Sequence, residues 1–207
     1  MLFSYSKFNL FYFPVTFLLL LLILFLRIYL NAYLNVPLHF DEAQYWSWSL
    51  SPAWGYFSKP PLLAWIISIS NYTCGDSEFC IRLPVPILYF FATIFVYFST
   101  RILTQNNFIS SFSAIIFNLI PGITFSSFIT TTDVPLILFS SIFIFLFLII
   151  YKKNNPSYFH FFLLSIIFSL GFLSKYAMVY FLISLFSALV FFKNIRTKFF
   201  NSKGIVF

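Results

Sequence analysis

The sequence predicts an all-α polytopic membrane protein, and its composition, its long apolar runs and the placement of its charges all point to this class. Of the 207 residues, 61% are hydrophobic and 8% are charged. A soluble globular domain has about 25% charged residues. With so little polar surface available, we exclude a soluble enzyme domain, a disordered chain and a nucleic-acid-binding module.

Six stretches are apolar enough to be transmembrane helices, each of which needs about 20 residues. They cover residues 8–33, 84–104, 108–129, 134–151, 157–174 and 176–192. No small-residue cleavage pattern follows the first stretch, so we expect it to be a retained helix and not a removed signal peptide. Residues 1–207 are therefore expected to form one transmembrane domain.

The placement of Lys and Arg predicts the orientation of the helices, because these residues accumulate in cytoplasmic loops. With a cytoplasmic N-terminus, eight of them and no acid lie inside. These eight are Lys7, Arg101, Lys152, Lys153, Lys193, Arg196, Lys198 and Lys203. We expect a multi-pass protein of the inner (plasma) membrane with both termini cytoplasmic, and we assign the net charge of +7 to topology, with no nucleic acid as partner.

The one long connection, residues 34–83, is expected to be a periplasmic loop with two short interfacial helices. We place these helices at 42–50 and 61–72, the second one after a proline pair, since proline suits a first helical turn. The loop holds all four Trp and four of the five acids. Its two cysteines, Cys74 and Cys80, can form a disulfide if the compartment is oxidising.

Three acids are candidate catalytic residues. Asp41 and Glu42 directly follow the first span, and Asp133 opens the fourth span on the same side. A carboxylate at a membrane face can act as a general base, because partial burial raises its proton affinity. The alternative is that Asp41 and Asp133 cap the starts of helices.

Positive residues on or near that side are candidates for binding an anion. Lys59 and Lys175 lie in the outer segments and could neutralise a phosphate, or they could extend to the lipid headgroups and do no more. Arg27 lies inside the first span, where a charge is costly unless it faces protein or water. His39 and His160 are expected on opposite sides of the membrane, so we predict no metal site and no cofactor. Whether the protein uses a divalent cation stays open.

Five motifs in register carry a resemblance to a known family. They are FDEAQYWSWS, AWGYFSKPPLLAW, GDSEFCIRLP, TTDVPLIL and GFLSKYAMV. In order and spacing the chain resembles, over about residues 23–185, the N-terminal half of bacterial GT-C glycosyltransferases related to protein O-mannosyltransferases and to lipid A aminoarabinose transferase. These are polytopic enzymes that use polyprenyl-phosphate sugars.

The resemblance implies roles for single residues. It implies that Asp41 is the essential acid of the first outer loop with Glu42 beside it, and that Asp133 is the second acid. It implies that Lys59 approaches the lipid phosphate. Lys175 matches the lysine of an SK turn, and the arginine that closes the outer loop is matched by Arg82.

We therefore predict a glycosyltransferase that moves a sugar from a polyprenyl-phosphate donor to a lipid, glycan or protein acceptor at the periplasmic face. Its catalytic residues would be Asp41, Glu42 and Asp133, and the donor phosphate would meet Lys59, Lys175, Arg82 and Arg27. Two alternatives stay open. One is a small ion-coupled transporter, and the other is a truncated, inactive remnant of a glycosyltransferase, because family members are typically more than twice as long.

Overall fold

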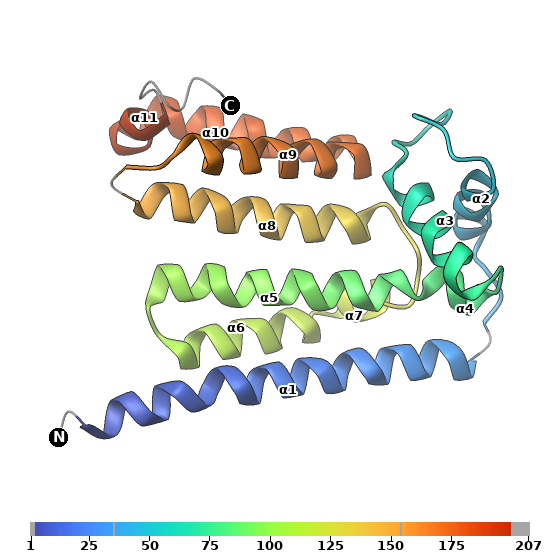
Figure 1. The fold of residues 1–207 in the computed structure, drawn as a ribbon, viewed down its shortest axis with the longest axis horizontal. Helices are drawn as coiled ribbons and strands as arrows, with labels where there is room; N and C mark the ends of the chain where they lie inside the picture. The colour runs from blue at the N-terminus through green and yellow to red at the C-terminus, as the bar shows by residue number, and fades with distance from the viewer. Residues whose placement is uncertain (1–2, 35, 154, 200–207) are drawn as a thin grey trace.

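The computed structural model describes residues 3–34, 36–153 and 155–199, with side chains described from residue 12 onward. The described residues form helices and no β-strand, which confirms the all-α class (Figure 1). The helices are α1 (Phe3–Leu34), α2 (Phe40–Ser49), α3 (Leu62–Cys74), α4 (Glu78–Arg82), α5 (Pro84–Thr104), α6 (Asn107–Leu119), α7 (Pro121–Ser126), α8 (Asp133–Lys152), α9 (Tyr158–Ser174), a 3₁₀ turn (Tyr176–Met178), α10 (Val179–Phe191) and α11 (Lys193–Phe199).

The long helices lie side by side as a bundle, and the short helices of the first loop cover one end of it. Figure 1 shows α2, α3 and α4 together at the end where α1 finishes and α8 begins. The start of α1 and helix α11 lie at the opposite end. The two short helices predicted in the loop are confirmed as α2 and α3, with shifts of one or two residues, while α4 was not predicted. The position of α2 and α3 at the membrane interface stays a prediction.

Among the described residues, three helices are long and apolar enough to cross a membrane, namely Tyr12–Leu34, Glu78–Thr104 and Asp133–Lys152. A fourth is counted if α10 and α11, which are bent by 112° relative to each other, make one span. Helices α6 and α9 have 13 and 17 residues and are shorter than a typical span. The total of six spans therefore stays a prediction.

The predicted continuous span over 108–129 is wrong. Helix α6 ends at Leu119, Ile120 has an extended backbone with ψ 124°, and α7 starts at Pro121. A proline disfavours the helical conformation of the residue before it and has no N–H to donate, so the helix ends where the proline begins. The chain then runs without regular structure from α7 to the start of α8.

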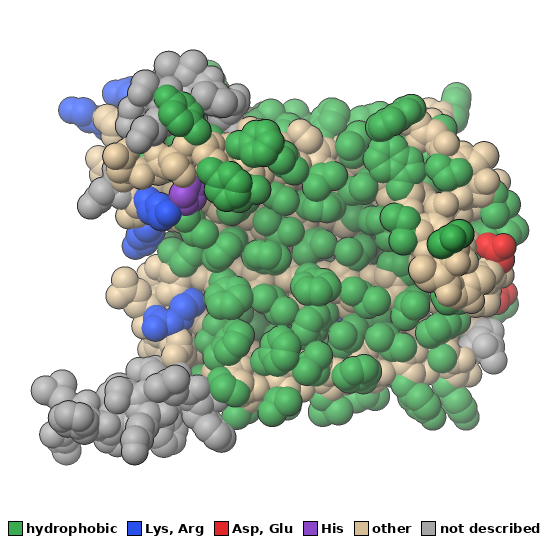
Figure 2. Space-filling model, viewed as in Figure 1, with side chains coloured by type: hydrophobic (Ala, Val, Ile, Leu, Met, Phe, Trp, Pro, Cys, Tyr) green, Lys and Arg blue, Asp and Glu red, His purple; other side chains and the backbone are tan. Residues whose placement is uncertain are grey.

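The two ends of the bundle carry opposite charges. In Figure 2 the visible Lys and Arg side chains lie at one end, near the α8–α9 turn, and the visible Asp and Glu side chains lie at the other. We call the latter the acidic end; it includes α2, α4 and the start of α8. The side chain of Lys7, and Lys203 as a whole, lie outside what the structure describes. The segregation agrees with the predicted topology, but which end faces the cytoplasm stays a prediction.

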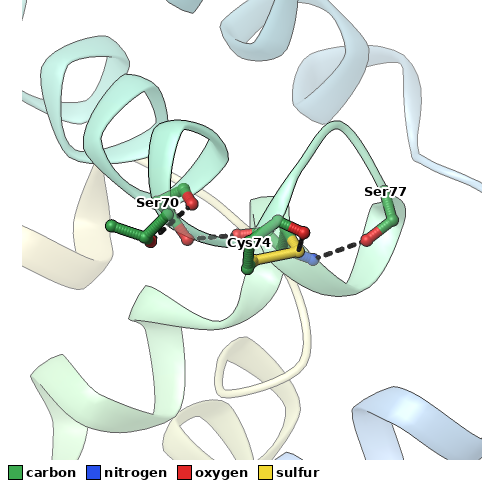
Figure 3. Close-up of a disulfide and its surroundings, with 5 residues drawn as sticks. Ser70, Cys74 and Ser77 are labelled. Atoms are coloured by element: carbon green, nitrogen blue, oxygen red, sulfur yellow. Dashed lines mark hydrogen bonds between the residues drawn. A yellow bond between two sulfur atoms is a disulfide. The ribbon is translucent and has the colours of Figure 1, made fainter.

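A disulfide fixes the turn between α3 and α4. Cys74 and Cys80 are bonded, with their Cα atoms 5.9 Å apart. Figure 3 shows the surrounding hydrogen bonds: the Ser70 hydroxyl donates to the Cys80 carbonyl at 2.6 Å, and the Ser77 hydroxyl accepts from the Cys80 N–H at 3.2 Å. Gly75 turns the chain with φ 92°, a left-handed value that glycine tolerates best. The turn thereby positions α4, which ends in Arg82.

Close packing of α8, α9 and α10 fixes the position of the end of α9. The buried core between these helices includes Phe143, Phe161, Leu164 and Met178. A Cβ on Gly171 would lie 2.8 Å from the Met178 sulfur, so glycine permits the tight approach where the chain leaves α9. This approach sets the position of the α9 terminus, which is followed directly by Lys175.

Reporter fusions test the orientation of the bundle. A reporter that is active only outside the cytoplasm should be active after Ser70 and inactive after Lys153, because the excess of Lys and Arg holds the second site inside. The measurement is reporter activity normalised to the amount of fusion protein. The reverse pattern would place the acidic end in the cytoplasm and contradict the topology.

Candidate active site at the acidic end

A buried ion pair joins α2 to the end of α4. Arg82 donates from Nε to one oxygen of Glu42 at 2.9 Å and from Nη2 to the other at 2.6 Å. The remaining donors of the same guanidinium reach the carbonyls of Val36 at 2.7 Å and Pro37 at 3.0 Å. Such two-point pairing is the strongest form of carboxylate recognition by arginine. The pair thereby holds three parts of the chain together: residues 36–37 before α2, helix α2 itself and the end of α4.

Glu42 also receives two backbone N–H groups. The Thr130 N–H donates to it at 2.8 Å and the His39 N–H at 3.0 Å. The Thr130 hydroxyl donates in turn to the Ile81 carbonyl at 3.2 Å. Glu42 thus serves as the cap of α2, the role that we had considered for Asp41, and it also holds the segment that leads into α8.

The environment of Glu42 keeps it ionised. Its exposed fraction is 0%, and this burial by itself would raise the pKa of the carboxyl group. The hydrogen bonds from Arg82, Thr130 and His39, together with the charge of Arg82, outweigh burial and leave the pKa of Glu42 below its usual value. A carboxylate with both oxygens occupied and a lowered pKa is a poor general base.

A second ion pair lies at the start of α8. The Lys175 ammonium lies 2.7 Å from a carboxylate oxygen of Asp133, and the two side chains are 35% and 47% exposed. Asp133 is the first residue of α8, and Lys175 follows the last residue of α9. Each charge is favoured by the dipole of the helix end beside it. Because both side chains are accessible, a ligand can reach them.

Asp41 approaches the second ion pair through Tyr45. The two residues lie four positions apart on α2, so they share one face of the helix. Tyr45 is buried, and its hydroxyl contacts Thr132, the residue before Asp133. Burial and the charges of Asp41 and Asp133 raise the pKa of Tyr45. Asp41 and Asp133 therefore both lie in the neighbourhood of Tyr45, at the acidic end.

The Asp41 carboxylate is free for chemistry in the structure. It is half-buried, and no hydrogen bond or ion pair engages it within the described residues. It differs in this from Glu42 beside it, whose two oxygens are both bound. The geometry thus separates two acids that are adjacent in the sequence.

The Lys59 segment is connected to the same face of α2 by aromatic contacts. Tyr45 packs on Trp48 with ring centroids 5.7 Å apart, and Trp48 stacks on Tyr56 at 4.7 Å and 7°. The Tyr56 N–H donates to the Lys59 carbonyl at 3.3 Å and closes a tight turn. The Lys59 side chain is half-buried and makes no ion pair in the part of the chain that the structure describes.

Arg27 lies deeper, inside α1, and binds α6. Its guanidinium donates to the Asn118 side chain at 2.9 Å and to the Asn118 carbonyl at 3.2 Å. Asn118 donates to the Thr93 hydroxyl at 2.9 Å, and its carbonyl also accepts from Thr124 at 2.8 Å. No carboxylate pairs with Arg27 among the described residues. The cation therefore holds the point at which α6 breaks.

Comparison with known proteins assigns the family. Residues 58–206 match the family described as dolichyl-phosphate-mannose-protein mannosyltransferase. The chain belongs to this family. The match covers Lys59, Arg82, Asp133 and Lys175, whereas Arg27, Asp41 and Glu42 precede it. The family is one of GT-C membrane glycosyltransferases, and the several apolar helices of the chain agree with this membership.

One relative is lipid A galacturonosyltransferase RgtD of Rhizobium johnstonii (strain DSM 114642 / LMG 32736 / 3841). It is 29% identical to the chain over 145 residues, which are 68% of this chain and 29% of the relative. The chain therefore spans less than a third of the length of this relative. No solved structure matches the chain.

In this member of the glycosyltransferase family, the structure does not bring all the predicted site residues together. Asp133 and Lys175 pair with each other, Asp41 lies at the same end of the bundle, and the Lys59 segment packs on the face of α2 that carries Tyr45. Glu42 and Arg82 bind each other. The roles of all seven residues stay predictions. No cluster of His, Cys, Asp and Glu that could hold a metal ion occurs among the described residues.

Some residues that shape the site were not identified from the sequence. Tyr45 and Thr132 link α2 to α8, and Asn118 binds Arg27. The polar Asn118 inside an otherwise apolar stretch was a usable signal, because a buried amide needs partners. Tyr45 lies among several aromatic residues and carries no such signal.

The Glu42–Arg82 pair is expected to stabilise the fold. Glu42→Gln keeps the shape of the side chain but leaves the buried guanidinium without a counter-charge, which typically costs about 3 to 5 kcal/mol. Thermal unfolding of the detergent-solubilised protein should show a clear loss of Tm. Glu78→Gln, which changes an exposed acid of α4, is the matched control and should leave Tm unchanged. Equal Tm values for the two variants would contradict a structural role of the pair.

The same pair predicts a pH dependence of stability. Since the pKa of Glu42 is lower in the folded protein than in the unfolded chain, its contribution is complete above the usual value of about 4.3 and is lost as the pH falls through the folded pKa. Tm measured from neutral pH downward should fall more steeply in the wild type than in Glu42→Gln. Parallel curves would show that another group dominates acid unfolding.

Proposed function

We propose that this chain belongs to an enzyme that transfers a sugar from a polyprenyl-phosphate donor to a lipid, glycan or protein acceptor at the periplasmic face of the inner membrane. The observation that carries the proposal is the presence, at one end of the bundle, of an accessible Asp133–Lys175 pair and of Asp41, whose carboxylate makes no hydrogen bond or ion pair among the described residues. Family membership supports the reaction class.

The chemistry of the transfer accounts for these residue types. The bond between the sugar C1 and the phosphate oxygen breaks, and a bond between C1 and the acceptor oxygen or nitrogen forms. The leaving group is already an anionic phosphate, so it needs nearby positive charge and no proton. The acceptor must lose a proton, so it needs a base. An acid and a cation at one site supply these two functions.

We assign the base to Asp41 and the donor phosphate to Lys175 and Lys59. Asp41 is half-buried and unpaired, whereas Glu42 is committed to Arg82 and is assigned a positioning role with it. Lys175 is accessible at the end of α9. Its partner Asp133 would orient the Lys175 ammonium group, or pair with it again after the phosphate leaves. Arg27 is assigned a positioning role, since its donors meet Asn118.

A site at the end of the bundle suits a substrate that is half lipid. The polyprenyl chain can stay in the bilayer while its sugar meets an acceptor in water. A transporter would instead place its charged residues along a path near mid-membrane. The described acids lie in α2, in the α3–α4 turn, in α4 and in the first turn of α8, and none lies in the middle of a long helix. This arrangement favours transfer at the surface.

Replacement of Asp41 tests the assignment of the base. Asp41→Asn keeps the size of the side chain and removes the proton acceptor, so kcat should fall by about 10²-fold or more. The measurement is sugar transfer by the purified full-length enzyme, with expression and Tm as checks on folding. Asp76→Asn, at an exposed acid of the same loop, is the matched control. Transfer at the wild-type rate by Asp41→Asn would eliminate Asp41 as the base.

Replacement of the lysines tests the assignment of the phosphate. Lys59→Met should weaken donor-lipid binding by about 1.5 to 3 kcal/mol, the range for a hydrogen bond to a charged group, and Lys59→Arg should keep part of the affinity. Lys175→Met should have a smaller effect, because in the structure the Lys175 ammonium already pairs with Asp133, which offsets part of its attraction for the phosphate. Lys152→Met, at the opposite end of the bundle, is the control. Unchanged donor affinity in both Met variants would leave both lysines as headgroup anchors.

A further inference from the structure

The segment between α2 and α3 presents two aromatic side chains to the outside. Trp54 is 88% exposed and Phe57 is 103% exposed. Lys59 follows two residues later in the same segment and has no ion-pair partner among the described residues. We call Trp54, Phe57 and Lys59 the aromatic tip. Large exposed apolar side chains that lie together usually mark a surface that binds something.

The backbone of this segment is held in place, so the exposure does not come from a loose chain. The Tyr56 hydroxyl accepts the Ala53 N–H at 3.1 Å and donates to the Trp48 carbonyl at 3.0 Å. The Trp65 indole donates to the Ala53 carbonyl at 2.9 Å. The Trp54 ring stands edge-on to Trp65 with centroids 5.3 Å apart. The aromatic tip is thus projected by a fixed turn.

The location of the turn points to the surface of the bilayer. Figure 1 shows the segment that joins α2 and α3 just beyond the ends of α8 and α9, at the acidic end of the bundle. Since Asp133–Lys152 is one of the spanning helices, the plane through its first residue lies near one membrane–water interface. Tryptophan and snorkelling lysine are the residues that concentrate at this depth.

We propose that the aromatic tip inserts Trp54 and Phe57 into the lipid headgroup layer at the acidic end, and that this insertion holds Lys59 at the level of the lipid phosphates. The occupant of the exposed face is therefore the bilayer. Two aromatic rings and a cation without a protein counter-charge complement an apolar layer topped by phosphates. The second part of the proposal rests on the proposed donor-phosphate role of Lys59.

Tryptophan fluorescence in vesicles tests the insertion directly. The full chain with Trp46, Trp48 and Trp65 each changed to Phe keeps Trp54 as its one tryptophan. In phosphatidylcholine–phosphatidylglycerol vesicles, lipids brominated near the headgroup end of the acyl chain should quench most of the Trp54 emission, and aqueous iodide should quench little. A single-tryptophan variant that keeps the half-buried Trp46 is the matched control and should be quenched weakly by both agents.

A second variant keeps the test valid if the triple change disturbs the turn. Trp54→Phe alone retains the Trp65 hydrogen bond, and it should remove the fraction of emission that brominated lipid quenches. Two outcomes would overturn the proposal. Quenching by iodide and not by brominated lipid would place the tip in water, and quenching by neither would mean that protein covers it.

Donor affinity tests the second part separately. Trp54→Ser with Phe57→Ser should raise the KM for the donor lipid several-fold while kcat changes little, because the chemistry is untouched and only the depth of Lys59 changes. Tyr72→Ser, at an exposed aromatic residue of α3 outside the aromatic tip, is the control and should leave KM unchanged. If the tip is quenched by lipid but KM does not change, the tip is an anchor and does not position Lys59. If the enzyme transfers no sugar at all, the quenching result still stands, so failure of the proposed function is recognised separately.

Discussion

The arrangement of the acidic end depends on the pairing of Glu42 with Arg82. This pair joins four parts of the chain: the connection after α1, the first turn of α2, the end of α4 and the segment before α8. A buried carboxylate without these partners would carry a large desolvation cost. The surrounding backbone is therefore held where it can supply N–H groups and carbonyls. Asp41 and Asp133 are positioned as a result, since one directly precedes Glu42 and the other lies three residues after Thr130.

The two neighbouring acids show how the fold assigns different chemistry to similar residues. Glu42 points into protein and is fixed by a guanidinium and two amides, while Asp41 is half-buried and unpaired in the described structure. The two roles have opposite requirements. A carboxylate that stabilises the fold must have its oxygens bound by partners, whereas a general base must keep an oxygen available for the substrate proton. The one-residue offset on α2 meets both requirements, because consecutive residues of a helix point about 100° apart.

Much of this end could be predicted from the sequence, and the limits have physical causes. The proline pair and the polar composition located α3 and α2, and the resemblance pointed to Asp41, Asp133 and Lys175, whose roles stay predictions. The pairing of Glu42 with Arg82 could not be predicted, because it joins residues 40 positions apart and depends on the tertiary fold. The break after Leu119 was missed although Pro121 was visible, because the apolar composition of residues 108–129 outweighed the single proline in our interpretation.

That break has a consequence for the bilayer itself. A 13-residue helix rises about 20 Å, and the hydrocarbon core is about 30 Å thick, so α6 cannot cross it alone. Backbone that is not helical is tolerated at membrane depth only where protein or water satisfies it, and here Arg27 and Thr124 meet the Asn118 carbonyl. We expect lipids that contact α6 directly to shorten or tilt to match it. The membrane is expected to be locally thin on this flank, which shortens the distance that a lipid-borne headgroup travels to the acidic end.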